Sequence, residues 1–302
     1  MQPCTHRDAL IYSIMKRNAL IVVIAALWTT LAAAQGEYID DLGRSIVLQS
    51  PAQRIVSLAP SITETLFAVG AGGQVVGVTD YCDYPPEARD KQSIGGMIGP
   101  SVEMIISLEP DLIIVTPEGN AQESFRQIRD IGVPVFVTNP RSLEGIYKSI
   151  HDLGQLAGRT DEAAAVISTM RAAEDSLKLM TGVKVSILLI ISVQPLIVAG
   201  TGTFLAEMIE LGGGENVAAK SGLSYPTFSR EQVVASDPAV IILTADIPGK
   251  REVLSLYPEW QQVAAFRTGR VHEMDPNLVS RPGPRAVKGA AKIRNLLFPR
   301  PD

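Results

Sequence analysis

The sequence predicts an α/β protein with two lobes of parallel sheet joined by one long helix. Short, wholly apolar runs recur between helical stretches, which is the pattern of parallel strands covered on both faces. The middle of the chain, from Leu143 to about Met180, contains no convincing strand. A helix–strand motif of one pattern occurs once before that segment and once after it. These observations predict a lobe, a long helix and a second lobe.

The first half of the chain alternates strands and helices. Arg54–Leu58 has the pattern of a short buried strand, and the S-x-x-E sequence from Ser61 to Glu64 predicts a capping box at the start of the next helix. Glycines 70, 72 and 73 end that helix. The other strands predicted in this half are Val75–Val78, Leu112–Val115 and Val133–Val137.

The middle segment and the second half complete the pattern. Asp161–Leu179 is rich in strong helix formers, and a helix of about 20 residues spans about 30 Å, the width of a domain. We therefore expect lobes at residues 35–142 and 183–302, with a helical connector at 143–182 that includes the long linking helix. The strands predicted in the second lobe are Val185–Val193 and Val240–Leu243, and its helices are Phe204–Leu211 and about Ala286–Leu297.

The N-terminal segment has the pattern of a secretory signal peptide. An apolar run, Ala19–Leu27, follows Lys16 and Arg17, and small residues precede Gln35. We expect residues 1–34 to be removed by cleavage after Ala34, and the mature protein to be periplasmic. An uncleaved membrane anchor is the alternative. A lipid anchor is not expected because no cysteine stands at the cleavage point, and either Met1 or Met15 is compatible as the start.

Composition excludes several classes of function. The formal net charge is −5 and no long basic run occurs, which argues against a nucleic-acid partner. Two cysteines and three histidines are too few for a disulfide framework or a Cys-rich zinc site. We expect no metal ligands and no resident cofactor. Cys82 is either an ordinary loop cysteine or a reactive thiol, and His151 is expected on a helix surface.

The internal repeat contains one glutamate in each half. Ser101–Val115 and Ser229–Leu243 share the pattern S-x-E-x-φ-φ-x-x-acid-P-x-φ-I-I-φ, where φ is aliphatic. In each copy the serine is a helix N-cap candidate and the glutamate, Glu103 or Glu231, lies in the first turn. Each acid either offsets the positive end of its helix or is displayed to a two-fold symmetric partner.

Four segments resemble, in the same order, parts of the periplasmic substrate-binding proteins of ABC importers for vitamin B12, ferric siderophores and haem. The similarity extends over about Tyr38 to Phe298, and within the family it is greatest to the cobalamin-binding members, on the Tyr81–Pro85 and Tyr225–Gln232 segments. The four segments are Arg54–Gly70, Val78–Pro86, Ser101–Leu112 and Ser229–Val240.

The resemblance implies two Rossmann-like lobes with a ligand cleft between them and one rigid linking helix. It implies a monomeric receptor that captures a corrinoid, or alternatively a ferric siderophore or haem, and delivers it to a permease dimer with its ATPase subunits. The ligand would be a large organometallic complex of cobalt or iron. By motif, Glu103 and Glu231 match the glutamates that pair with arginines on the permease.

The resemblance also implies ligand contacts. Tyr81 and Tyr225 match aromatic positions that face the corrin. Met97 stands near the place of an expected tryptophan, and its polarizable sulfur could pack on a macrocycle. Arg281 resembles a cleft arginine before the last helix, with a surface loop charge as the alternative.

The main rival class is an enzyme with a nucleotide cofactor. Gly200–Leu205 follows an apolar strand and resembles a dinucleotide-binding loop, but Leu205 stands where the third glycine belongs. A receptor linked to a sensor rather than to a transporter is a third alternative. We expect binding rather than catalysis.

Overall fold

The computed structural model describes residues 36–117, 122–180, 182–244 and 249–299. The predicted signal peptide and its cleavage point after Ala34 lie outside the described residues. Within the described ranges, no helix has both the length and the apolar character that crossing a membrane requires.

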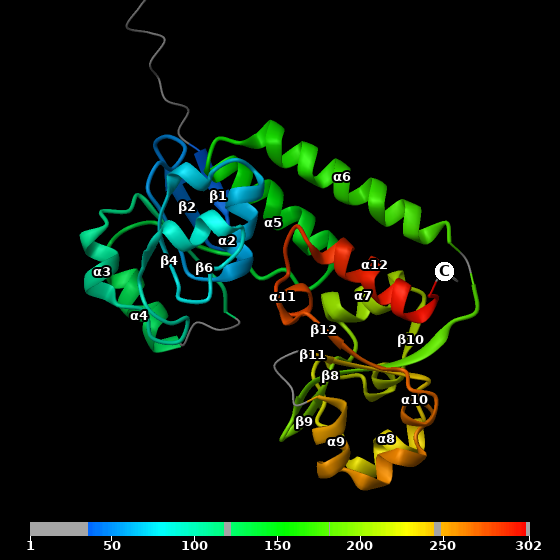
Figure 1. The fold of residues 1–302 in the computed structure, drawn as a ribbon. Coiled ribbons are helices and arrows are strands. Elements are labelled where there is room, and N and C mark those ends of the chain that lie inside the picture. The colour runs from blue at the N-terminus through cyan, green and yellow to red at the C-terminus, as the bar shows by residue number, and fades with distance from the viewer. Residues whose placement is uncertain (1–35, 118–121, 181, 245–248, 300–302) are drawn as a thin grey trace, which may run out of the picture.

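The first lobe is built on a parallel sheet with the strand order β5-β4-β3-β6-β7 (Figure 1). Three of its strands lie where they were predicted: β3 (Ile55–Ser57), β4 (Val75–Val78) and β6 (Leu112–Val115). β7 (Val135–Val137) begins later than predicted, after Pro134, which has no N–H to donate to the ladder. The remaining elements are the antiparallel pair β1 (Gly36–Ile39) and β2 (Ser45–Leu48), β5 (Gln92–Ser93), α2 (Pro60–Ala68), α3 (Val102–Ser107), α4 (Gln122–Asp130) and α5 (Leu143–Leu156).

The second lobe repeats the same topology. Its parallel strands are ordered β10-β8-β11-β12, which matches β4-β3-β6-β7 of the first lobe strand for strand, and β9 is added antiparallel to β8. Its strands are β8 (Val185–Val193), β9 (Leu196–Val198), β10 (Gly214–Asn216), β11 (Val240–Thr244) and β12 (Val271–Met274). Its helices are α7 (Phe204–Leu211), α8 (Arg230–Ser236), α9 (Lys250–Leu256), α10 (Ala264–Arg267), α11 (Pro276–Val279) and α12 (Ala286–Leu297). Short 3₁₀ helices occur at Gly72–Gln74, Pro86–Asp90, Val217–Ser221 and Pro258–Gln262.

The helix α6 (Thr160–Lys178) runs along both lobes (Figure 1). It follows α5, which packs on α2 in the first lobe, and it leads into β8 of the second. α6 also contacts α7 and α12 in the second lobe. The predicted fold class is thus confirmed, while the boundaries at residues 142 and 182 stay predictions.

Alternate residues of the central strands enter different hydrophobic clusters. In β6, Leu112 and Ile114 pack in a central cluster, whereas Ile113 and Val115 pack in a second cluster beneath α3 and α4. In β8 of the second lobe, Ile187 and Leu189 likewise pack in the central cluster, whereas Leu188 and Ile190 pack in a third cluster. Both faces of each sheet are therefore covered, which explains the wholly apolar strands.

The central cluster is shared by the two lobes. It contains buried residues of both sheets, of α2, α5, α7 and α12, and Met170 and Leu177 of α6. Because close-packed interiors deform little, one continuous core restrains the lobes from moving apart or closing widely.

Candidate functional site

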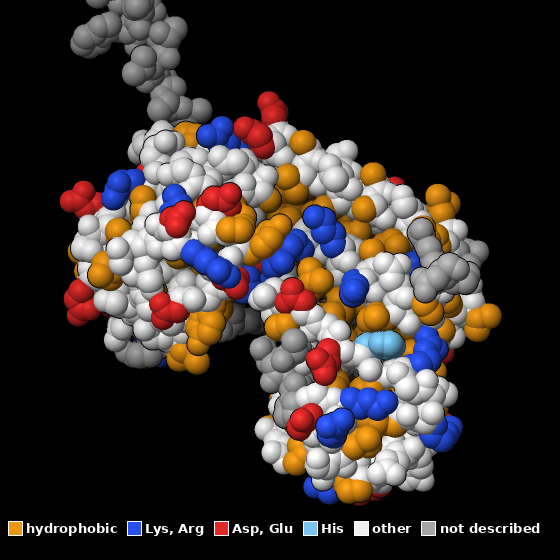
Figure 2. All heavy atoms as spheres, viewed as in Figure 1, with side chains coloured by type: hydrophobic (Ala, Val, Ile, Leu, Met, Phe, Trp, Pro, Cys, Tyr) orange, Lys and Arg blue, Asp and Glu red, His pale blue; other side chains and the backbone are white. Residues whose placement is uncertain are grey.

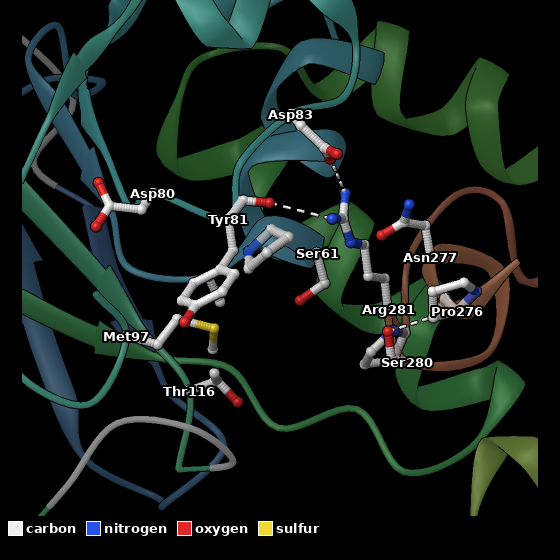
Figure 3. A pocket seen from close by; sticks show the side chains of 13 residues that line it. Ser61, Asp80, Tyr81, Asp83, Met97, Thr116, Pro276, Asn277, Ser280 and Arg281 are labelled. Carbon is white, nitrogen blue, oxygen red and sulfur yellow. Dashed lines mark hydrogen bonds and ion pairs between the residues drawn. The ribbon is translucent and has the colours of Figure 1, made fainter. Parts of the chain in front are cut away.

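A cavity of about 670 Å³ opens between the lobes (Figures 2 and 3). In the first lobe its wall is formed by the segments that follow the carboxyl ends of β3, β4 and β6. In the second lobe it is formed by the segment from Pro276 to Pro282, after β12. The order of parallel strands reverses between β4-β3 and β6-β7, and the carboxyl ends at such a point are where open α/β sheets bind ligands.

Three of the four residues predicted to contact ligand line this cavity. Tyr81 and Met97 project into it from the first lobe, and Arg281 reaches toward them from the second lobe (Figure 3). The Tyr81 side chain is well exposed, with 61% of the residue accessible. The tertiary structure thus brings together residues separated by up to 200 positions in the chain.

Tight turns position Tyr81 and Met97. Cys82 N–H donates to Thr79 O at 3.0 Å, and Asp80 N–H donates to Gly95 O at 3.0 Å, so the loop after β4 is tied to the loop that carries Met97. Gly95 has a φ of 91°, which favours glycine at this turn. Both side chains therefore project from backbone with defined hydrogen bonds.

Tyr225 does not line the cavity. It is 39% exposed and lies on a segment that pairs with the end of β9: Gly200 N–H donates to Ser224 O at 2.8 Å, and Val198 N–H donates to Pro226 O at 3.2 Å. A side chain at Gly200 would place its Cβ 2.0 Å from Leu223 O, so glycine is required for this close approach. A ligand role for Tyr225 stays a prediction.

The glycine-rich loop has a structural explanation. Gly200 admits the neighbouring backbone, Gly202 has a φ of 68°, and the Thr203 hydroxyl accepts from Ala206 N–H to cap α7. These contacts account for the residues that resemble a dinucleotide-binding fingerprint.

The capping box predicted at Ser61 is wrong. Pro60 occupies the first turn and Ala59 is the N-cap residue, without a side-chain cap, so the helix begins two residues earlier than the motif suggests. Ser61 instead lines the cavity, and Glu64 is buried in the interior of α2.

Glu64 is held by two arginines from the segment before α12. Arg285 donates from Nε and Nη2 to the two carboxylate oxygens, at 2.8 and 2.6 Å, and Arg281 Nη1 donates to Oε1 at 2.9 Å. Arg281 also donates to Asp83 Oδ1 at 2.7 Å and to Tyr81 O at 3.1 Å. The predicted cleft arginine is thus a cleft residue whose charge is already paired with two carboxylates of the protein itself.

Sequence reasoning missed Glu64, Asp83 and Arg285. A signal was present for Glu64, because a glutamate among apolar residues on a helix that faces a core needs a buried cationic partner. Its partners could not be identified, because they lie more than 200 residues later in the chain.

The described lining residues of the cavity carry little positive charge. Its charged side chains are Asp80, Asp83 and Arg281, and Arg281 is already neutralised by Glu64 and Asp83. Burial by itself raises the pKa of Asp83, but the hydrogen bond and the charge of Arg281 outweigh it and lower that pKa below its ordinary value. Burial acts to lower the pKa of Arg281, but its two carboxylate partners raise it. This wall therefore offers carboxylates, hydroxyls and amides rather than a spare cation.

Glu103 and Glu231 occupy equivalent places. Each is an exposed residue in the first turn of a helix, α3 or α8, whose N-cap serine accepts a backbone N–H. The hydrogen bond from Ser229 lowers the pKa of Glu231. In Figure 1, α3 lies at the outer edge of the first lobe and α8 at the lower end of the second, both on the side away from α6.

The repeat extends to backbone conformation. Glu109 and Asp237, which precede the proline in each copy, have φ values of 46° and 37°. The first copy then leads into β6, which pairs with β3, and the second leads into β11, which pairs with β8. Only the second copy contains a full capping box, between Ser229 and Gln232.

The remaining chemistry-bearing residues take structural positions. Cys82 is buried, and burial raises the pKa of its thiol although it contacts the hydroxyls of Thr63 and Thr79. His151 is an exposed residue of α5. Across the described part of the chain, no group of three or more His, Cys, Asp or Glu side chains could hold a metal ion.

Similarity to known proteins agrees with this architecture. The chain is 30% identical over 249 residues to the vitamin B12-binding protein of Vibrio campbellii, covering 80% of this chain and 88% of the relative. The structure matches the periplasmic vitamin B12-binding protein of Vibrio cholerae with a TM-score of 0.71 at 27% identity, over 82% of this chain and 97% of the other. It matches the periplasmic haem-binding protein of Roseiflexus sp. RS-1 with a TM-score of 0.72 at 30% identity, over 82% and 98%.

A family model described as periplasmic binding protein matches residues 55–278, which include both sheets and most of the cavity wall. The family consists of binding proteins rather than enzymes, so the expectation of binding without catalysis is confirmed and the nucleotide-dependent enzyme is set aside. The family model matches most of the chain, and the structure has two α/β lobes of one topology with a cavity between them. The chain therefore belongs to the periplasmic binding protein family.

Proposed function

We propose that this protein captures a corrinoid, such as vitamin B12, in the cavity between its lobes and delivers it to the permease dimer of an ABC importer. The observation that carries the choice of ligand is the charge of the cavity wall, where Arg281 is already paired with Glu64 and Asp83, and Asp80 adds a further carboxylate. Corrinoids carry peripheral amides, whose N–H groups can donate to the Asp80 carboxylate. A ligand rich in carboxylates would instead meet like charge.

Aromatic and sulfur contacts support the same ligand. Tyr81 and Met97 offer an apolar face and a polarizable thioether on one side of the cavity. The volume of about 670 Å³ is within the range of small-molecule sites, and the open cleft in Figure 2 leaves room for parts of a larger ligand. Relatives that are named for vitamin B12 binding add further support.

The test is a titration of the purified protein with cyanocobalamin, a cobinamide, haemin and a ferric siderophore, read by absorbance and calorimetry. Trp260 is buried in the third hydrophobic cluster, in the second lobe and outside the cavity lining, so its fluorescence is a poor reporter of ligand binding. We expect the corrinoids to bind most tightly. Corrinoid affinity no tighter than the millimolar range would overturn this choice of ligand.

Haem is the second candidate, because the exposed phenol of Tyr81 could supply an axial oxygen ligand to iron. Tyr81→Phe separates the two candidates. It keeps the aromatic face, so corrinoid affinity should be nearly unchanged, but it would remove the iron ligand and shift the absorbance spectrum of bound haem.

Delivery requires recognition of the permease, and we assign this role to Glu103 and Glu231. Both carboxylates are exposed, at equivalent positions on the two lobes. Each interacts with its N-cap serine, but a carboxylate has further acceptor positions for charge-assisted hydrogen bonds from arginines. The double variant Glu103→Gln with Glu231→Gln should bind ligand normally but abolish uptake in vesicles that contain the permease and its ATPase subunits. Each single variant should retain part of the uptake, and normal uptake by the double variant would refute the assignment.

The proposal includes the export and the oligomeric state of the protein. The protein acts as a periplasmic monomer released by cleavage after Ala34, without a lipid anchor. It needs no resident cofactor, because the cobalt or iron belongs to the transported ligand. Mass spectrometry of the exported protein tests the cleavage point, and analytical ultracentrifugation tests the monomer.

A further inference from the structure

Four charged side chains form a continuous ion-pair chain beside the cavity. Arg285 and Arg281 both bind Glu64, and Arg281 continues to Asp83. Two positive charges therefore meet two negative charges. The two arginines come from the segment before α12, whereas Glu64 is on α2 and Asp83 is on the loop after β4, so the chain joins the two lobes.

The members differ in burial. The Glu64 side chain is 2% exposed and the arginines are 10% and 14% exposed, but the Asp83 side chain is 38% exposed and lines the cavity. Glu64 is thus the fixed centre of the chain. Asp83 is its outer end, at the surface that a ligand would meet.

Three successive contacts tie one loop to the arginines. Arg281 donates to Tyr81 O and to Asp83 Oδ1, and the guanidinium of Arg285 lies over the Tyr84 ring, 4.0 Å from its centroid. Arg281 Nη2 reaches the backbone of the same residue whose side chain projects into the cavity (Figure 3). The Tyr81 backbone, from which the ring projects, is therefore held from the opposite lobe as well.

We propose that Asp83 and Arg281 are positioning residues, which hold the loop from Tyr81 to Tyr84 against the second lobe and thereby fix the Tyr81 ring for ligand binding. This inference rests on the proposed function, because it takes Tyr81 as a ligand contact. Glu64 and Arg285 anchor Arg281 in the orientation that reaches the loop. Arg281 acts on the ligand through Tyr81 rather than by donating to the ligand.

The first variant is Asp83→Asn, which removes the charge but keeps the size. Binding would then have to order the loop, so we expect corrinoid affinity to fall by roughly threefold to tenfold. The matched control is Arg89→Gln. Arg89 is the other, solvent-exposed partner of Asp83, at 3.8 Å, and lies outside the cavity wall, so its removal should leave affinity unchanged.

A double-mutant cycle separates positioning from direct contact. If Asp83 acts through Tyr81, Asp83→Asn should weaken binding in the wild-type background but add little in a Tyr81→Ala background. Additive losses would show that Asp83 contacts the ligand independently and would overturn the inference. Arg281→Lys keeps one charge without the fork that reaches both Tyr81 O and Asp83, so it should rescue only part of the loss caused by Arg281→Gln.

A measurement without ligand keeps the inference separate from the proposed function. Hydrogen exchange of the Cys82 amide, which donates to Thr79 O, should become faster in Asp83→Asn than in wild type and in Arg89→Gln. Unchanged exchange would overturn the positioning role even if corrinoids bind. Faster exchange together with no corrinoid binding by the wild type would retain the loop anchor and refute the proposed ligand.

Discussion

Replacing Glu64 by glutamine should strongly destabilise the protein. The side chain is buried and accepts three hydrogen bonds at 2.6–2.9 Å from two arginines that are themselves largely buried. Glutamine keeps the shape and one acceptor but removes the charge, and it turns an N–H₂ group toward a guanidinium. Arg281 then keeps Asp83 as a partner, but Arg285 loses the carboxylate that pairs with it.

Removing one partner of a buried ion pair costs about 3–5 kcal/mol. Because Asp83 still compensates Arg281 and one acceptor remains, we expect the lower end, a loss of about 3 kcal/mol in the free energy of unfolding. For a domain of this size, about 1 kcal/mol corresponds to roughly 2–4 °C, so the melting temperature should fall by about 6–12 °C.

Differential scanning calorimetry of both proteins measures this loss directly. The matched control is Glu103→Gln, the same chemical change at an exposed residue in a first helical turn, where the cost should be about 0.3–1 kcal/mol. A Glu64 variant no less stable than the Glu103 variant would refute the reasoning. It would mean that the two arginines are adequately solvated without their carboxylate.

Three further predictions concern packing, pH and motion. Gly200→Ala should lower the free energy of unfolding by about 1–3 kcal/mol, because the new Cβ would lie 2.0 Å from Leu223 O. The control Gly73→Ala, whose Cβ would have nothing within 4 Å, should change it little. Urea denaturation measures both. The pKa of Asp83 is lowered from 3.8, so this carboxylate stays charged and paired with Arg281 above pH 4. Corrinoid affinity should therefore stay constant from pH 8 to about pH 5 and fall only as the pH passes below 4. An affinity that already falls near pH 6 would contradict this. Small-angle scattering should show little compaction when ligand binds, because one hydrophobic core extends through both lobes, and a large compaction would show that this core opens.

Local sequence patterns predicted the elements whose physics is local. The apolar runs of β3, β6, β8 and β11 and the helix formers of α6 lie where they were expected, because burial on both faces and helix propensity are visible in a short window. The small strands β5 and β10 and the hairpin of β1 and β2 were not predicted. They are two to four residues long, too short for a clear hydrophobic pattern, and each is defined by its pairing with another strand.

The candidate site was predicted only in part, for a related reason. Tyr81, Met97 and Arg281 were identified from the resemblance to the family, and the structure places all three in the lining of one cavity. Tyr225 was identified in the same way, but hydrogen bonds between its segment and the end of β9 hold it outside the described cavity lining. Its role depends on where a ligand extends beyond that lining.

The sequence by itself determined the two-lobed α/β class, the long helix between the lobes and the repeated glutamates, because each depends on spacing within about 20 residues. Only the tertiary structure decided that Ser61 does not cap α2, and that Glu64 pairs with Arg281 and Arg285, more than 200 residues away. A buried charge must find its counter-charge in space, and folding rather than chain order sets that distance. That Arg281 is already neutralised in the cavity wall, and with it the choice of ligand, emerges only when these partners are known.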